Sequence, residues 1–181
     1  MNSLEDLVQA CQKAADSQSP ETQVEAVLKE ALKDIPHLKS LIPDRPEEDF
    51  LVHRSNNLTI WRIRFVPGVV YPPHDHGHHT ICAVYEGAET NTFYEERGGE
   101  LVKLKEQVYP APCVFSLSGE KIVMSGNLGS TDMVALHLQL GDLIETHRHV
   151  WDPATSQKHE YSDKVFVQLA KYPPGYDIPV V

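Results

Sequence analysis

The stretch that decides the fold of this 181-residue chain runs from Val66 to Gly87, VPGVVYPPHDHGHHTICAVYEG. It places four histidines within six positions, between a pair of prolines and an apolar run that ends in glycine. In an extended segment residues i and i+2 project from the same face, so His74 and His76 present two imidazoles side by side. Such a pair can supply two nitrogen ligands to one metal ion. The stretch predicts the rim of a β-strand that carries a metal site, and a solvated, histidine-rich turn is the alternative.

The first forty residues have a helical pattern. Segment 3–15 is amphipathic, and segment 19–35 opens with Ser19 as an expected N-cap and Pro20 at the first helical position. The apolar residues of the second segment recur at helical spacing on one face: Val24, Val27, Leu28, Ala31, Leu32 and Ile35. The prolines and acids of IPDRPEED then end the helical part. We therefore expect residues 1–49 to form a helical segment packed on the remainder of a single domain.

From Phe50 to about Leu143 the pattern changes to short apolar or alternating runs broken by glycine and proline. The runs cover residues 58–66, 80–87, 90–96, 100–106, 113–119, 121–127 and 133–140. Their close spacing leaves no room for crossover helices, so the sheet should be antiparallel and should form a closed barrel or a two-sheet roll. We expect a mainly β domain over residues 50–181, with a turn-rich C-terminal tail that wraps its outside.

Composition excludes several classes of protein. The formal net charge is −10 without a basic cluster, which disfavours nucleic acid as a partner. The chain has no run of 18 apolar residues and no signal-peptide pattern at its start, so neither a membrane span nor export is expected. Its three cysteines, Cys11, Cys82 and Cys113, lack the CxxC spacing of metal sites and suit reduced thiols in the cytoplasm.

The spacing around the histidine pair matches a known motif. Gly68 precedes His74 by five intervening residues, and three residues separate His76 from Thr80, which Gly87 follows after six more. This is the first cupin motif, with Thr80 where the motif usually has glutamate. Together with IVMSGN (residues 122–127) and VALHLQLGDLIETHRHVWDP further on, residues 50 to 155 resemble the bacterial branch of the cysteine dioxygenase (thiol dioxygenase) family of the cupin superfamily.

The resemblance implies a fold, a cofactor and a reaction. Its members are cupin barrels that hold one ferrous ion through three histidines and add O2 to a small thiol whose carboxylate an arginine binds. His74 and His76 match the first two iron ligands, and Arg54 falls at the place of the substrate-binding arginine. Thr80 stands where animal members have cysteine, so their thioether crosslink cannot form here. The resemblance gives no indication of the oligomeric state.

The chain departs from the family at two places. Val123 replaces the third histidine ligand, and the family's Ser-x-His-x-Tyr is here Ala135, His137 and Gln139. In segment 133–140 the even positions are apolar, so His137 lies on the opposite face and approaches the site if that face looks into the barrel. His137 is therefore a candidate third ligand, with a histidine hydrogen-bonded away from the metal as the alternative.

The remaining histidines are weaker candidates. His78 and His79 follow a bend at Gly77, where strand alternation no longer fixes their direction. We expect His147, His149 and His159 in the tail, like His37 and His53, to be solvated.

Three functions remain open. The first is an Fe(II)-dependent oxygenase that acts with O2 on a small carboxylate-bearing, thiol-like molecule, with His137 and Thr80 as candidate catalytic residues and Arg54 binding the substrate. The second is a degenerate cupin that serves as a binding or regulatory module. The third is a cupin lyase, isomerase or hydrolase with another divalent metal. Val123 favours the last two, whereas His74, His76 and Arg54 favour the first.

Overall fold

Three helices form the N-terminal part of the structure, a computed structural model that describes residues 1–45, 47 and 49–178. They are α1 (Leu4–Ala15), α2 (Pro20–Ala31) and α3 (Ile35–Leu41), with the 3-10 turn η1 (Leu32–Asp34) before α3. Ser3 caps α1, since its side chain accepts a hydrogen bond from the backbone N–H of Asp6. Pro20 opens α2, but the expected cap Ser19 makes no side-chain hydrogen bond there. The N-terminal helical segment is thus confirmed.

The loop expected after these helices lies only partly within the described residues, because Pro46 and Glu48 fall outside them. Across the described part of the chain, none of the helices is both long and apolar enough to cross a membrane.

Antiparallel strands make up most of the remaining chain. Their bounds are β1 (Asp49–Arg54), β2 (Thr59–Phe65), β3 (Thr80–Glu86), β4 (Ala88–Arg97), β5 (Glu100–Pro110), β6 (Cys113–Leu117), β7 (Ile122–Gly126), β8 (Met133–Gln139), β9 (His149–Trp151) and β10 (Lys158–Glu160). One sheet has the order β1-β2-β8-β3-β6 and a second has the order β5-β4-β7, while β9 and β10 form a hairpin. Each of the seven runs that the sequence marks as strands overlaps one of these strands, and β4 and β5 extend beyond their runs.

The strand order identifies a jelly roll, also called a double-stranded β-helix. Val70 and His74 form antiparallel bridges to Gly126 and Val123 of β7, so segment 70–74 extends the second sheet. The chain then alternates between sheets, and β2-β8-β3-β6 faces the set formed by segment 70–74, β7, β4 and β5. This is the expected cupin-type, mainly β fold, built as two facing sheets that do not join into one continuous barrel.

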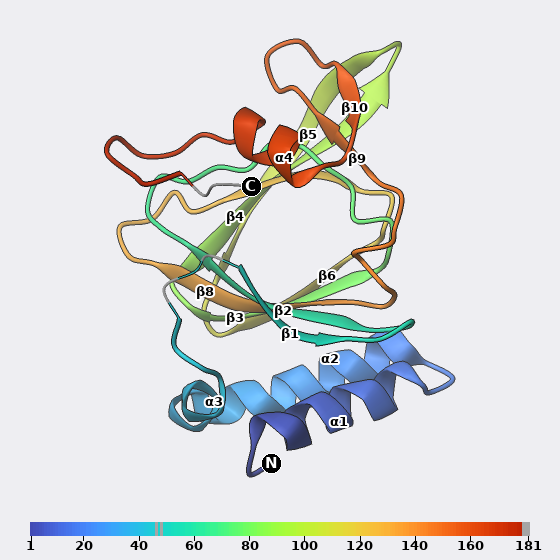
Figure 1. Ribbon diagram of the computed structural model, residues 1–181, viewed down its shortest axis with the longest axis vertical. Coiled ribbons are helices and arrows are strands. Elements are labelled where there is room, and N and C mark those ends of the chain that lie inside the picture. The colour runs from blue at the N-terminus through green and yellow to red at the C-terminus, as the bar shows by residue number, and fades with distance from the viewer. Residues whose placement is uncertain (46, 48, 179–181) are drawn as a thin grey trace.

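The first sheet separates two apolar clusters. On its outer face Leu136 and Leu138 of β8 pack with Val24 and Leu28 of α2, and Figure 1 shows α1 and α2 lying along this side of the sheet. On its inner face other residues of β8 pack between the sheets, in a cluster that includes Ala135, Met133, Cys82 and Val123. The alternation along β8 therefore directs apolar residues to the helices and its odd-numbered residues inward.

The C-terminal tail has structure that its sequence pattern does not indicate. It contains the β9–β10 hairpin and helix α4 (Asp163–Leu169), which Ser162 caps by accepting a hydrogen bond from the backbone N–H of Val165. Seven residues are too few to display helical periodicity, so the sequence predicts only turns here. Figure 1 places α4 on the side of the sheets opposite to α1 and α2.

Candidate functional site

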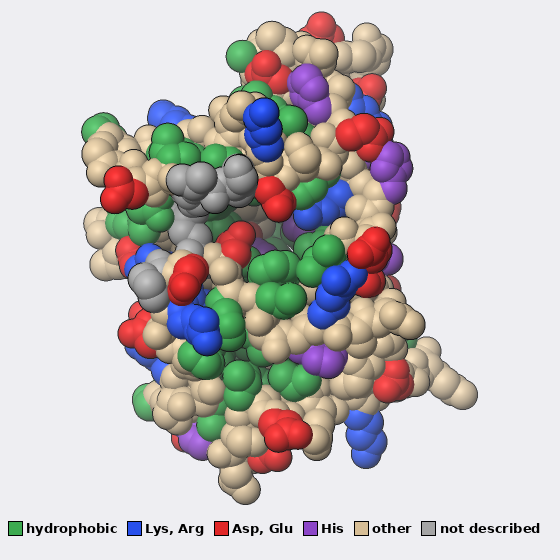
Figure 2. All heavy atoms as spheres, in the orientation of Figure 1, with side chains coloured by type: hydrophobic (Ala, Val, Ile, Leu, Met, Phe, Trp, Pro, Cys, Tyr) green, Lys and Arg blue, Asp and Glu red, His purple; other side chains and the backbone are tan. Residues whose placement is uncertain are grey.

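A cavity of about 1020 Å³ lies between the two sheets. Both sheets contribute to its wall, and segment 161–167 with part of α4 covers one side. Figure 2 shows a recess on this face of the molecule, bordered by hydrophobic and charged side chains. The histidines among the described lining residues are His74, His76 and His137.

His74 and His76 form a close pair in this cavity. Their ring centroids are 4.8 Å apart and both side chains are buried. Nδ1 of His74 donates to the carbonyl oxygen of Pro72 at 2.8 Å, which leaves Nε2 as the nitrogen with a lone pair. Nδ1 of His76 is buried without a hydrogen-bond partner among the described residues. The pair thus offers two imidazoles whose remaining nitrogens the protein does not use.

The cavity keeps both imidazoles of the pair uncharged. Burial lowers the pKa of His74 to about 4, and the positive charge of Arg148 acts in the same direction. Burial also holds the pKa of His76 well below its ordinary value, with further contributions from His74, His137 and Arg148. Metal ions bind neutral imidazole, so the pair is ready to act as ligands at neutral pH.

His137 lies in the cavity wall but in a different electrostatic state. Its Nε2 donates to the buried carboxylate of Glu89 at 3.0 Å. Burial opposes the charged ring, but Cys82 and Glu89 outweigh burial and hold the pKa of His137 well above its ordinary value. A protonated imidazole bound to a carboxylate has no lone pair for a metal. The structure therefore places His137 in the same cavity as the histidine pair, with Nε2 hydrogen-bonded to Glu89. This is the alternative considered above, a histidine that is hydrogen-bonded away from the metal.

Val123 occupies the position opposite His74. The two residues exchange backbone hydrogen bonds of 2.9 and 3.0 Å across an antiparallel bridge. The Val123 side chain is fully buried and shares its strand face with Ser125, which lines the cavity. An apolar side chain thus faces inward where the resemblance leads one to expect a third histidine.

Thr80 is placed away from the cavity lining. It is buried at the start of β3, and its hydroxyl donates to the carbonyl oxygen of His78 at 3.2 Å. His78 and His79 do not line the cavity either, because their ring nitrogens meet Thr146 at 2.6 Å and Glu21 at 3.4 Å. The geometry gives Thr80 no contact through which it would take part in chemistry.

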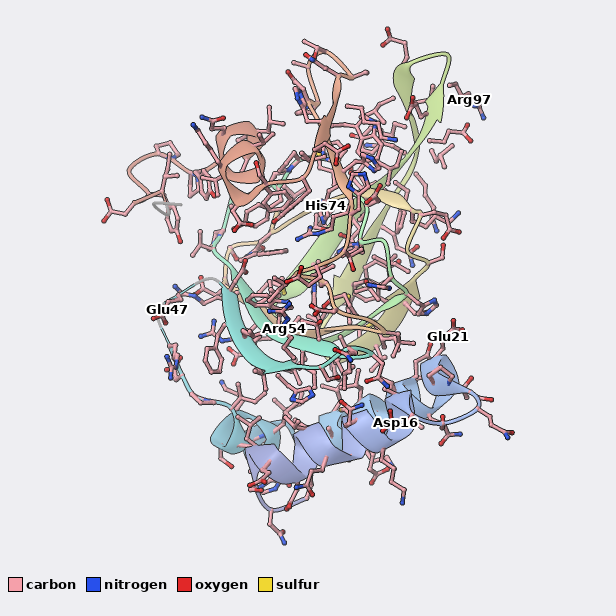
Figure 3. The ribbon with its side chains drawn as sticks, turned by 45° about the vertical axis from the view of Figure 1, so that its right-hand side comes forward. Asp16, Glu21, Glu47, Arg54, His74 and Arg97 are labelled. Atoms are coloured by element: carbon pink, nitrogen blue, oxygen red, sulfur yellow. The ribbon has the colours of Figure 1, made fainter. Side chains whose placement is uncertain are left out.

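Arg54 also lies outside the cavity. Its guanidinium is exposed and donates to the carboxylates of Asp142 and Glu145, each at 2.9 Å at the closest approach. Figure 3 shows Arg54 beside β1 and β2, whereas His74 lies farther from the helices, between the sheets. The structure does not bring Arg54 to the histidine pair. Its positive charge is instead neutralised at the surface by Asp142 and Glu145.

Arg148 is the arginine that lines the cavity, and sequence reasoning missed it. Its Cζ lies 3.3 Å from the ring centroid of Tyr161. Arg54, Arg64 and Arg97 form the arginine salt bridges found among the described residues. Arg148 forms none within that part of the chain, so its charge is available to an anion in the cavity. Strand alternation in the segment HRHV (residues 147–150) could have indicated that the Arg148 side chain points to the face opposite to His147 and His149.

A second cluster of ligand-type groups lies outside the cavity. Within the described residues, His147, His149 and Glu160 are the only three histidine, cysteine or carboxylate groups whose ligand atoms all lie within 4.8 Å of one another. The expectation that His147 and His149 are merely solvated overlooks Glu160, which the β9–β10 pairing brings opposite His149.

Comparison with known proteins finds similar solved structures at low sequence identity. No protein-family model matches the chain, and no curated protein matches it. Similar solved structures include an RmlC-like cupin family protein from Methanocaldococcus jannaschii with a double-stranded β-helix fold, at 12% identity and a TM-score of 0.47, over 57% of this chain and 91% of that one. A cupin superfamily protein from Desulfitobacterium hafniense DCB-2 matches at 20% identity and a TM-score of 0.42, over 58% and 88%.

Oxalate oxidase is a further similar structure, at 18% identity and a TM-score of 0.40, over 54% of this chain. The chain spans about half of that protein's length, with 53% of it covered.

Proposed function

We propose that this protein is a metal-dependent oxygenase of the cupin type that acts on a small carboxylate-bearing thiol. The observation that carries the proposal is the placement of two neutral imidazoles in one cavity with a guanidinium that forms no salt bridge among the described residues. Imidazoles held neutral suit a divalent metal, and the guanidinium suits an anionic substrate. The thiol and the use of O2 come from the family resemblance.

The residues present fit a metal bound at the histidine pair. Nε2 of His74 is left free by the hydrogen bond of Nδ1 to Pro72, and Nδ1 of His76 is buried and has no hydrogen-bond partner in the part of the chain that the structure describes. Two protein ligands leave several coordination positions for substrate, O2 and water. Fe(II) is the metal that the resemblance implies, and another divalent ion is the alternative. A bound ferrous ion would supply the redox chemistry that O2 requires.

The chain's own residues would bind and orient the substrate. Arg148 offers a planar pair of N–H donors that matches a carboxylate, and Tyr161 supports the guanidinium from one face. Phe166 of α4 stacks on Tyr71, with ring centroids 5.0 Å apart, and lies 5.1 Å from His74. This aromatic cover would exclude water from the reacting centre. The overall conversion adds both atoms of O2 to the thiol sulfur and yields a sulfinic acid, with no further reductant.

A binding module without oxygenase activity is the second candidate. Two observations favour it: Val123 stands in place of the third histidine, and Nε2 of His137 is bound to Glu89. Two imidazoles hold ferrous iron weakly compared with three. In this function the cavity would retain a small anion through Arg148 without reacting it.

The test measures binding and oxygen uptake together. Protein reconstituted anaerobically with Fe(II) is titrated with a panel of small thiols that carry a carboxylate, and O2 consumption is then compared with sulfinate formed. Equal amounts of O2 consumed and sulfinate formed support the oxygenase, whereas binding without uptake supports the binding module. Neither binding nor uptake across the panel contradicts both.

Two arginine variants sharpen this test. Arg148→Met should weaken thiol binding by about 10–100-fold, because the variant loses the only lysine or arginine among the described residues that line the cavity. Arg54→Met is the matched control and should bind as the unmodified protein does, since Arg54 lies outside the cavity and forms salt bridges with Asp142 and Glu145. The opposite result would return the substrate-binding role to Arg54.

A further inference from the structure

The β9–β10 hairpin carries a second set of metal-ligand side chains, on the outer side of the cavity wall. His149 is the first residue of β9 and His147 lies two residues before it, with ring centroids 5.1 Å apart. Glu160 of β10 pairs in register with His149. The set therefore combines one histidine of β9, the histidine just before this strand and a carboxylate of β10, and zinc accepts these ligand types.

The ligand atoms of this set lie close to one another, all within 4.8 Å. Oε2 of Glu160 lies 2.9 Å from Nδ1 of His147, and Oε1 lies 3.9 Å from Nε2 of His149. The His147 and Glu160 side chains are largely exposed, so small rotations can bring all three ligand atoms to metal-bonding distance without disturbing the core. Water can complete a four-coordinate site.

An outer carboxylate already orients the least mobile ligand. Nδ1 of His149 donates to Oδ2 of Asp75 at 3.0 Å, so Nε2 is left with the lone pair that faces Glu160. Metal-binding histidines generally make this contact, since a carboxylate fixes the tautomer and the ring orientation. The hydrogen bond is an observation independent of the close approach of the three ligand groups.

The same residues connect the hairpin to the cavity. Asp75 lies between His74 and His76, and its second oxygen accepts a hydrogen bond from the backbone N–H of His149 at 3.0 Å. Arg148 lies between His147 and His149 and lines the cavity. Alternation thus places the hairpin histidines on the outer face of a wall whose inner face presents the guanidinium.

We propose that His147, His149 and Glu160 bind a divalent transition-metal ion of the zinc type, in addition to any metal in the cavity. The ion cross-links β9 to β10 and, through Asp75, fixes the segment that carries the cavity histidines. Its role is structural, because the site lies at the surface and its ligands do not line the cavity.

The test uses Zn²⁺ as the probe, and the metal-binding side chains of His74 and His76 in the cavity are removed first. In a His74→Ala/His76→Ala parent, isothermal titration should find one Zn²⁺ per chain. His147→Ala and Glu160→Gln should each weaken this binding by tenfold or more, or abolish it. His159→Ala is the matched control, because His159 precedes Glu160 on β10 and projects from the opposite face; it should bind as the parent does. Absence of binding to the parent, or equal binding by all variants, overturns the proposal.

Two further measurements keep the test decisive. If the double-alanine parent does not fold, the unmodified chain replaces it, and His147→Ala should then lower the number of Zn²⁺ bound by one while His159→Ala leaves it unchanged. Asp75→Asn should weaken Zn²⁺ binding by about 10-fold, as loss of an outer-shell carboxylate does. The hairpin can bind Zn²⁺ whether or not the cavity is an oxygenase site, so the two proposals fail independently.

Discussion

The two faces of β8 differ in what their side chains do. Leu136 and Leu138 face the N-terminal helices and lie in an apolar cluster. His137 and Gln139, their neighbours in the chain, line the cavity on the other face. The outer face therefore stabilises the fold by burying apolar surface, whereas the inner face exposes polar groups to an interior space.

Polar atoms of the inner region lack protein partners. Buried side-chain atoms without a hydrogen bond among the described residues include Nε1 of Trp61, Nδ1 of His76, both amide atoms of Asn91 and Oε1 of Gln139. Each such atom can pair with water or with a polar ligand in the cavity. The comparison teaches that the interior between the sheets presents polar groups that a polar ligand can use, while the helix-covered face provides stability.

The largest effect should come from the apolar face. Leu138→Ala should lower the free energy of unfolding by about 2–5 kcal/mol, because the buried side chain leaves a cavity against the helices. Gln139→Leu is the neighbouring control and should change stability by less than about 1.5 kcal/mol, since it removes an unsatisfied carbonyl and keeps the volume. Urea unfolding measures both, and equal losses would contradict the division of labour between the faces.

The next effect concerns the affinity of the cavity for an anion. Arg148→Met should weaken the binding of a small carboxylate-bearing thiol by about 10–100-fold, which corresponds to the loss of charge-assisted hydrogen bonds worth about 1.5–3 kcal/mol. The melting temperature of the protein without ligand should change little, because Arg148 is only half-buried. Titration calorimetry measures the affinity for the thiol, and thermal unfolding measures the melting temperature. A large loss of stability would mean that Arg148 serves the fold and not ligand binding.

A third prediction adds a ligand to the inner face. Val123→His places an imidazole opposite His74, and Fe(II) affinity should rise at least about tenfold, the smallest change typical of altering a metal site's surroundings. Anaerobic titration with Fe(II) measures the affinity, and circular dichroism checks the fold. If the fold is intact and the affinity for Fe(II) is unchanged, the side chain at position 123 of β7 does not point toward the metal position.

The smallest effect is a pH dependence on the helix side. Burial raises the pKa of the Cys11 thiol in α1 from 9.0 to about 12. The unfolded chain therefore loses this proton first, so the stabilisation by Cys11 is complete below pH 9 and is lost between pH 9 and 12. Relative to Cys11→Ala, the protein should lose about 1 kcal/mol between pH 9 and pH 10. Urea unfolding at the two pH values checks this, and a constant difference would contradict the burial of the thiol.

Much of the framework follows from short-range sequence patterns. The helical spacing of Val24 and Leu28 and the alternation in segment 133–140 correctly indicate which side chains are buried against the helices and which face inward. The pair His74 and His76 could be predicted for the same reason, since two ligands from one extended segment need only local geometry.

Residues far apart in the sequence decided the rest. The partner of His137 is Glu89, 48 positions away, and the partners of Arg54 are Asp142 and Glu145. Periodicity gives the face on which a side chain lies, but the protonation of His137 and the neutralisation of Arg54 depend on which strands the jelly roll brings together. The sequence by itself determined the β framework and the histidine pair. Only the tertiary structure placed Arg148 in the cavity wall and brought His147 and His149 close to Glu160. The reason is that these contacts depend on which strands pair, and local sequence patterns do not contain that information.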